Sequence, residues 1–145
     1  MQKMKTTLGW REWVALPDLE LASIKAKVDT GAKTSCLHAF NLEPFEKDGE
    51  NWIKIWLHPN QDDNETEHQC EARIIDQRSV RDSGGHEEIR YVVETTLELA
   101  GQCFPIELTL TNRDSMKFRM LLGRQAMLER FIVNPTASYL IKQPS

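Results

Sequence analysis

The residues best suited to do chemistry form the run Val28-Asp29-Thr30-Gly31-Ala32, where an apolar, strand-like segment ends in a carboxylate. A carboxyl group at the end of a strand can act as a general acid or base when its surroundings tune its pKa. The glycine beside it allows another backbone to approach closely, and the Thr30 hydroxyl can hydrogen bond within the turn. The same tripeptide also suits an ordinary Asx turn that only ends the strand. Asp29 is therefore a candidate catalytic residue with a structural alternative.

A second run lies late in the chain. Residues 120–124 read Met-Leu-Leu-Gly-Arg, an apolar segment that ends in Gly123 and Arg124. The spacing of the apolar residues after Gly123 predicts one short helix over Arg124–Arg130. This pattern places a glycine where a strand passes into a helix, which is a position where two backbones can lie close together.

The elements that would position both runs are strands. Apolar and polar residues alternate along several segments, and alternation at a period of two is typical of half-buried strands. The predicted strands are Gly9–Leu16, Leu21–Asp29, Trp52–Leu57, Cys70–Asp76, Ile89–Leu99, Cys103–Thr111, Phe118–Leu122, Phe131–Asn134 and Ser138–Ile141. Many short strands joined by turns favour an all-β barrel or sandwich, and we expect residues 1–145 to form one domain.

The composition excludes several functional classes. The chain has 145 residues and a net charge of −4, without a basic stretch that would favour nucleic acid. No apolar run is long enough for a membrane span or a signal peptide. The cysteines Cys36, Cys70 and Cys103 are odd in number and widely spaced, which argues against a disulfide framework. We therefore expect a cytoplasmic protein.

With both runs in place, the chain resembles the retropepsins, the single-lobe aspartic proteases of retroviruses and their cellular relatives. Those proteins share an apolar-Asp-Thr-Gly-Ala turn and a late apolar-apolar-Gly-Arg before a C-terminal helix. Here Ser83-Gly84-Gly85 and the strands that follow are similar to the glycine-tipped flap hairpin. The resemblance implies a closed barrel in which Asp29 is catalytic, Thr30, Gly31 and Ala32 form the active-site turn, and Gly84 and Gly85 contact substrate.

The resemblance narrows to a bacterial retropepsin-like family whose members are often labelled ATP-dependent zinc proteases and are linked to ATP-grasp glutamate ligases. It rests on Leu8–Pro17, Asp29–Ala39, Asn112-Arg113 and the 120–124 run. The sequence has no phosphate-binding Gly-x-x-x-x-Gly-Lys-Ser/Thr motif. His68 and Cys70 could meet one metal ion, but a full ligand set does not converge in the sequence. We therefore expect no metal and no other cofactor.

One chain supplies one Asp-Thr-Gly, so an aspartic protease mechanism requires a second Asp29 from a symmetry-related partner in a homodimer. The run Asp82-Ser83-Gly84 is a rival acid motif, but it does not follow an apolar strand. We interpret Asp82 as a residue of the flap. The terminal strands are candidates for the dimer interface.

The chain departs from the retropepsin pattern at Lys33, where the family places an acid that pairs with the late arginine, here Arg124. Two cations beside the substrate groove would favour an acidic peptide or protein substrate, although Lys33 also fits a solvated turn. The family's link to glutamate ligases implies glutamate-rich chains as a first substrate to test. The leading hypothesis is a homodimeric aspartic endopeptidase. The alternative is a catalytically inactive, protease-like module that binds an extended peptide by strand addition.

Overall fold

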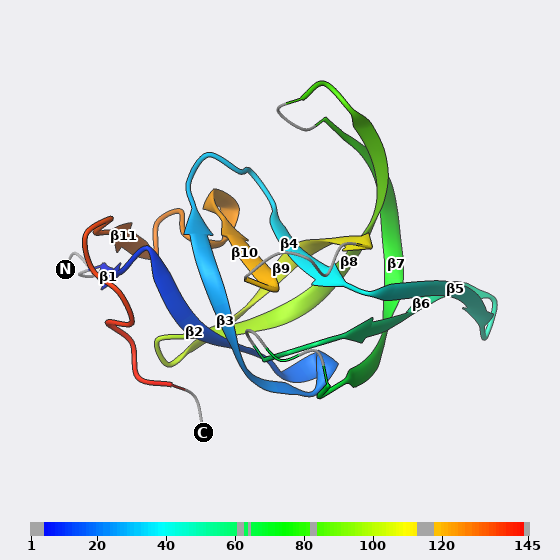
Figure 1. Ribbon diagram of the computed structural model, residues 1–145, viewed down its shortest axis with the longest axis horizontal. Helices are drawn as coiled ribbons and strands as arrows, with labels where there is room; N and C mark the ends of the chain where they lie inside the picture. Colours follow the sequence, from blue (N-terminus) through cyan, green and yellow to red (C-terminus); the bar gives the residue numbers. More distant parts are fainter. Residues whose placement is uncertain (1–4, 61–62, 64, 82–83, 113–117, 144–145) are drawn as a thin grey trace.

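The structure is a computed structural model that describes residues 5–60, 63, 65–81, 84–112 and 118–143. Its elements are almost all strands (Figure 1). In chain order they are β1 (Thr6–Leu8), β2 (Arg11–Leu16), the 3-10 helix η1 (Pro17–Leu19), β3 (Leu21–Asp29), β4 (Ser35–Ala39), β5 (Asn41–Lys47), β6 (Glu50–Leu57), β7 (His68–Arg81), β8 (Glu87–Leu99), β9 (Gln102–Asn112), β10 (Met120–Gly123), the 3-10 helix η2 (Arg124–Ala126) and β11 (Phe131–Val133).

The main sheet closes on itself. Its strand order is β2-β3-β10-β4-β9-β8-β7-β6-β5, and a further pairing joins β2 to β8 through Ala15 and Glu98. The strands β2, β3, β10, β4, β9 and β8 therefore form a closed ring of six strands. The predicted all-β closed barrel is confirmed. Within the described ranges, no helix has the length and apolar character needed to cross a membrane.

The barrel interior is filled by the apolar residues of the alternating segments. In β3, Ile24 and Ala26 are buried while Lys27 is exposed, as the alternation along this strand predicts. The core continues with leucines and isoleucines of β4, β6, β8, β9 and β10. Burial of these side chains is the main force that fixes the strand register, since a shift of one residue would turn every apolar side chain outward.

Three strands distant in sequence meet where β3 ends. Strand β10 lies between β3 and β4, parallel to β3 and antiparallel to β4. In this register Gly123 is the partner of Asp29. The topology thus places the late Gly-Arg run directly beside the acid turn.

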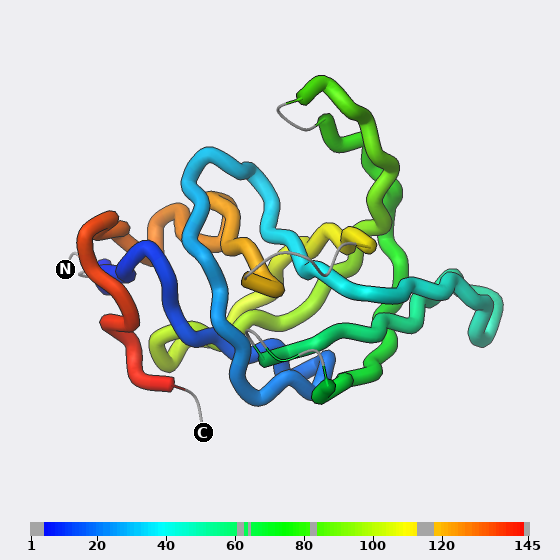
Figure 2. The backbone as a smooth tube through the Cα atoms, in the orientation of Figure 1, coloured from blue at the N-terminus to red at the C-terminus, as the bar shows by residue number. Residues whose placement is uncertain are grey.

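The long strands β7 and β8 form a hairpin that projects beyond the barrel (Figures 1 and 2). The hairpin end and the turn after Asp29 both rise at the same end of the molecule, at the top of Figure 1. Gly84 and Gly85 are exposed at the hairpin end, and Gly85 has a φ of 85°, which a glycine adopts without strain. Asp82 and Ser83 lie outside the described residues.

The C-terminal part differs from the expectation in two places. The helix predicted over 124–130 is a 3-10 helix over Arg124–Ala126 that continues in turns, and Glu129 has a positive φ of 67°. Residues 138–141 do not form the predicted strand. Tyr139, with a φ of 52°, departs from extended geometry, and side-chain contacts to β2 hold this segment instead of a regular ladder.

Candidate active site

Asp29 is the last residue of β3 and is half-buried in the single chain. The N–H of Gly31 donates to Asp29 Oδ1 at 3.0 Å, and the N–H of Ala32 donates to the Asp29 carbonyl oxygen at 3.2 Å. These bonds orient the carboxylate and hold the turn of Thr30, Gly31 and Ala32. Because one hydrogen bond is that of an Asx turn, the local geometry is shared by the catalytic and the structural interpretation.

Gly123 packs tightly against the strand that follows this turn. A Cβ at this position would lie 2.5 Å from the Thr34 carbonyl carbon and 2.9 Å from the Ser35 nitrogen. The Gly123 N–H donates to Ser35 Oγ at 3.0 Å. Only glycine permits this approach, so the late glycine is explained by the close packing of β10 on the start of β4.

Arg124 holds the turn through hydrogen bonds to its backbone carbonyls. Its backbone N–H donates to the Ala32 carbonyl at 2.8 Å, and its Nη1 lies 3.2 Å from the Gly31 carbonyl oxygen and 3.5 Å from that of Thr30. Backbone carbonyls therefore take the place of the acid that the retropepsin pattern supplies. The structure places the Arg124 guanidinium on the turn.

Lys33 is exposed, and its carbonyl oxygen accepts the Gln125 N–H at 3.1 Å. Its charge acts on Glu107 of β9, because Lys33 is one of the groups that lower the pKa of the Glu107 carboxyl. Lys33 and Arg124 are thus both at the turn, but they face different partners.

A polar network that the sequence analysis did not single out joins β7 to β9. Arg78 donates to both carboxylate oxygens of Glu107, at 3.0 and 2.9 Å, and its Nε donates to Asp76 Oδ2 at 2.8 Å. Hydrogen bonds from Arg78 lower the pKa of both carboxyls. The only sequence signal is Asp76 and Arg78 at alternate positions, which puts them on one strand face.

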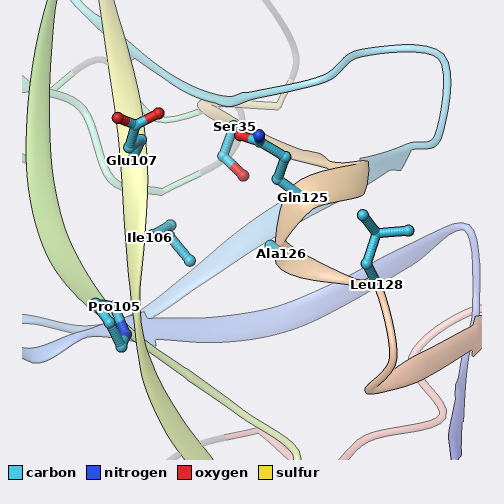
Figure 3. Close-up of a pocket in the computed structure, with 7 residues that line it drawn as sticks. All are labelled: Ser35, Pro105, Ile106, Glu107, Gln125, Ala126 and Leu128. Carbon is cyan, nitrogen blue, oxygen red and sulfur yellow. The ribbon is translucent and has the colours of Figure 1, made fainter.

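A cavity of about 420 Å³ lies between β9 and η2 (Figure 3). Its lining residues are Ser35, Pro105, Ile106, Glu107, Gln125, Ala126 and Leu128. Asp29 is not among them. In one chain, therefore, the acid turn lies beside this cavity and does not open into it.

The arrangement of His, Cys, Asp and Glu side chains determines whether the chain could bind a metal ion. Among the described residues, no three or more His, Cys, Asp or Glu side chains gather in a way that could hold a metal ion. The His68 ring contacts the Leu19 carbonyl oxygen through Nε2 at 2.8 Å. Burial, with help from the charges of Glu20 and Glu71, raises the pKa of the Cys70 thiol to about 12, which opposes the thiolate that a metal requires.

The closed barrel, the acid turn packed on a Gly-Arg run and the projecting hairpin together define a retropepsin-like fold. The model of the family described as retropepsin-like aspartic endopeptidase RimB matches residues 7–144, and the chain belongs to this family.

The curated relatives carry a different name. A protein of Shewanella halifaxensis, named "Probable alpha-L-glutamate ligase", is 45% identical over 143 residues, which cover 99% of this chain and 31% of that protein. A protein of Parasynechococcus marenigrum with the same name is 49% identical over 135 residues, covering 93% of this chain and 29% of the relative. The chain thus spans about a third of the length of these relatives.

Among solved structures, a protein of unknown function from Legionella pneumophila has a similar fold. The two chains superpose with a TM-score of 0.78 and are 26% identical, and the match covers 96% of this chain and 100% of that chain.

Proposed function

We propose that this chain is an aspartic endopeptidase that works as a homodimer, with Asp29 of each copy forming the catalytic pair. The observation that carries the proposal is the half-buried Asp29 carboxylate, oriented by Gly31 and set in a turn that Gly123 and Arg124 support. Membership of a family described as aspartic endopeptidases adds to it.

The chemistry follows from two carboxyl groups held side by side, as in aspartic proteases generally. Two carboxylates at close range share one proton, because both cannot ionise without strong repulsion. The ionised member takes a proton from a water molecule, whose oxygen attacks the peptide carbonyl. The protonated member donates its proton to the carbonyl oxygen as the tetrahedral intermediate forms. When the C–N bond breaks, the carboxyl that took the water's proton donates it to the departing amine, and the other carboxylate regains its proton from the intermediate's hydroxyl.

The partner copy would lie on the side of the Asp29 turn. A two-fold axis that pairs the two Asp29 residues must pass next to this turn, so neighbouring elements face the partner. Two large apolar side chains are exposed in the single chain. Leu128, which follows η2, has 63% of its surface exposed, and Ile132 of β11 has 55% exposed. Their burial would stabilise such a dimer.

For the substrate we propose an acidic, glutamate-rich peptide or protein in the cytoplasm. The exposed cation Lys33 is beside the Asp29 turn, and the curated relatives are named as ligases of glutamate. Gly84 and Gly85 at the end of the β7–β8 hairpin would cover the bound chain. A functional link to an ATP-grasp glutamate ligase fits these relatives.

The second candidate is a binding module that holds such a chain without cutting it. The names of the curated relatives favour it, since they refer to ligation and not to proteolysis. Binding by strand addition would use the same hairpin and turn.

The test is cleavage of glutamate-rich peptides by the wild-type chain and by two matched variants. Asp29→Asn should abolish cleavage while leaving the thermal unfolding transition in place, and Asp82→Asn should retain much of the activity. Cleavage should persist with a metal chelator and without nucleotide. Binding without cleavage by the wild type would favour the module, and equal loss in both variants would contradict the proposed pair of Asp29 residues.

A further inference from the structure

The projecting part of the β7–β8 hairpin has few backbone ties to the barrel. The ladder between β6 and β7 begins at the pair Trp52–Arg73, and the ladder between β8 and β9 ends at the pair Val92–Thr109. Beyond these pairs, residues 77–81 and 87–91 are in register only with each other. We call these two segments the flap arm.

Side-chain hydrogen bonds connect the flap arm to the barrel where the backbone ladders do not. The Arg78–Glu107 ion pair spans β8 and joins the flap arm to β9 of the barrel through two hydrogen bonds. A second, weaker tie runs from Thr111 Oγ1 to Glu88 Oε1 at 3.2 Å. Bidentate arginine–carboxylate pairs fix orientation as well as distance, so the first tie restricts the flap arm more strongly.

Glu107 is also close to the Asp29 turn along the barrel. Its neighbour Leu108 is the register partner of Ser35, the first residue of β4. Ser35 in turn accepts the Gly123 N–H, and Gly123 is the partner of Asp29. A short series of contacts therefore leads from the flap arm through β9, β4 and β10 to the backbone of Asp29.

We propose that Glu107 is a positioning residue that holds the flap arm, through Arg78, in a fixed place relative to the Asp29 turn. The effect on catalysis rests on the proposed endopeptidase function, but the effect on the arm does not. Arg78 and Glu107 are 37% and 34% exposed, so solvent screens the pair and the expected effect is moderate.

The experiment is amide hydrogen exchange on the substrate-free protein. Glu107→Ala should raise exchange of amides in the flap arm by roughly two- to fivefold, as expected for a partly exposed ion pair, and leave exchange in β3 and β10 unchanged. Arg78→Ala should do the same, and the double variant should be no worse than either single one. The control is Arg73→Ala, which removes the exposed Arg73–Glu50 contact on β6 and β7.

Kinetics separate this proposal from the proposed function. With an active wild type, Glu107→Ala should raise KM by roughly two- to fivefold with kcat nearly unchanged, because a loosened arm weakens binding of substrate and transition state alike. Unchanged exchange in Glu107→Ala, or additive effects in the double variant, would overturn the positioning role. Increased exchange in Glu107→Ala, together with a wild type that cleaves no peptide, would support the positioning role and overturn the endopeptidase.

Discussion

At the residue scale, the candidate site depends on one hydrogen bond to Asp29 and on the close packing of Gly123. The Asp29 carboxylate is oriented by one backbone N–H, and Gly123 occupies a position where a methyl group would meet the backbone of Thr34. Arg124 faces carbonyl oxygens of the turn, and Lys33 is an exposed cation next to the turn whose charge also acts on Glu107. Lys33 is therefore the residue that would favour the proposed acidic substrates.

Replacing Lys33 by glutamate should reduce the preference for acidic over neutral peptides. An exposed charge contributes little, so the ratio of kcat/KM values should fall by about two- to fivefold. The matched control is Lys47→Glu in the β5–β6 hairpin, which changes the net charge equally at a distant place. An unchanged ratio in Lys33→Glu would remove the charge argument.

The thiols should react very differently. Cys103 is exposed, whereas Cys70 is buried and the pKa of its thiol is raised to about 12, first by burial and then by Glu20 and Glu71. Since the thiolate is the reactive form, a thiol reagent at neutral pH should modify Cys103 quickly and Cys70 only after unfolding. Mass spectrometry of the modified peptides measures this order. Equal modification of both thiols in the folded protein would contradict the burial of Cys70.

Some of these residues could be predicted from the sequence and others could not. Asp29 and Gly123 stand in short runs whose residue types have a local meaning. Arg78 and Glu107 have no such context, because their contact depends on the order and register of β7, β8 and β9. The register between these strands is set by packing of the whole core, so no local sequence pattern predicts this pair.

At the scale of elements, a buried carboxylate holds the C-terminal segment onto the barrel. Glu12 of β2 is 0% exposed and accepts N–H groups of Gly9, Leu140 and Ile141 at 2.6, 3.0 and 3.0 Å. Three donors satisfy the buried carboxyl oxygens, whose burial without hydrogen bonds would be costly. This explains why residues 138–141 follow β2 without forming the predicted strand, and it ties a terminal segment that we considered for the dimer interface to its own barrel.

Glu12→Gln should lower the free energy of unfolding by about 1–3 kcal/mol, because the amide places a donor among backbone donors and leaves buried groups unsatisfied. Denaturant unfolding measures the change. The control is Gln143→Ala, which removes an exposed hydrogen bond to Ser23 and should have little effect. A stability loss as small as the control's would show that Glu12 does not hold the segment.

The strands could be predicted because the alternation of apolar and polar residues indicates which face of a strand is buried, as in β3 and β8. The short helix was predicted too long. Apolar spacing after Gly123 continues to Leu128, yet Leu128 is 63% exposed and the chain turns at Glu129. Tertiary contacts, in which Arg124 and Gln125 bond to the Asp29 turn, decide where the regular structure stops.

At the scale of the whole molecule, the proposed function makes each barrel one half of an aspartic protease site. The fold and the family are established, and the apolar side chains Leu128 and Ile132 are exposed in the single chain. Each site would then contain one Asp29 from each copy, so activity must depend on the composition of the dimer and not only on the amount of wild-type chain.

The most direct measurement mixes unfolded wild-type and Asp29→Asn chains in varied ratios, refolds them together and follows peptide cleavage. If each site needs two Asp29 residues, activity should follow the square of the wild-type fraction, so an equal mixture should retain about a quarter of the activity of the same total amount of wild type. A control mixture with Asp82→Asn should stay near the wild-type level. Activity that falls in direct proportion to the wild-type fraction, to about half in the equal mixture, would contradict a site shared between two copies.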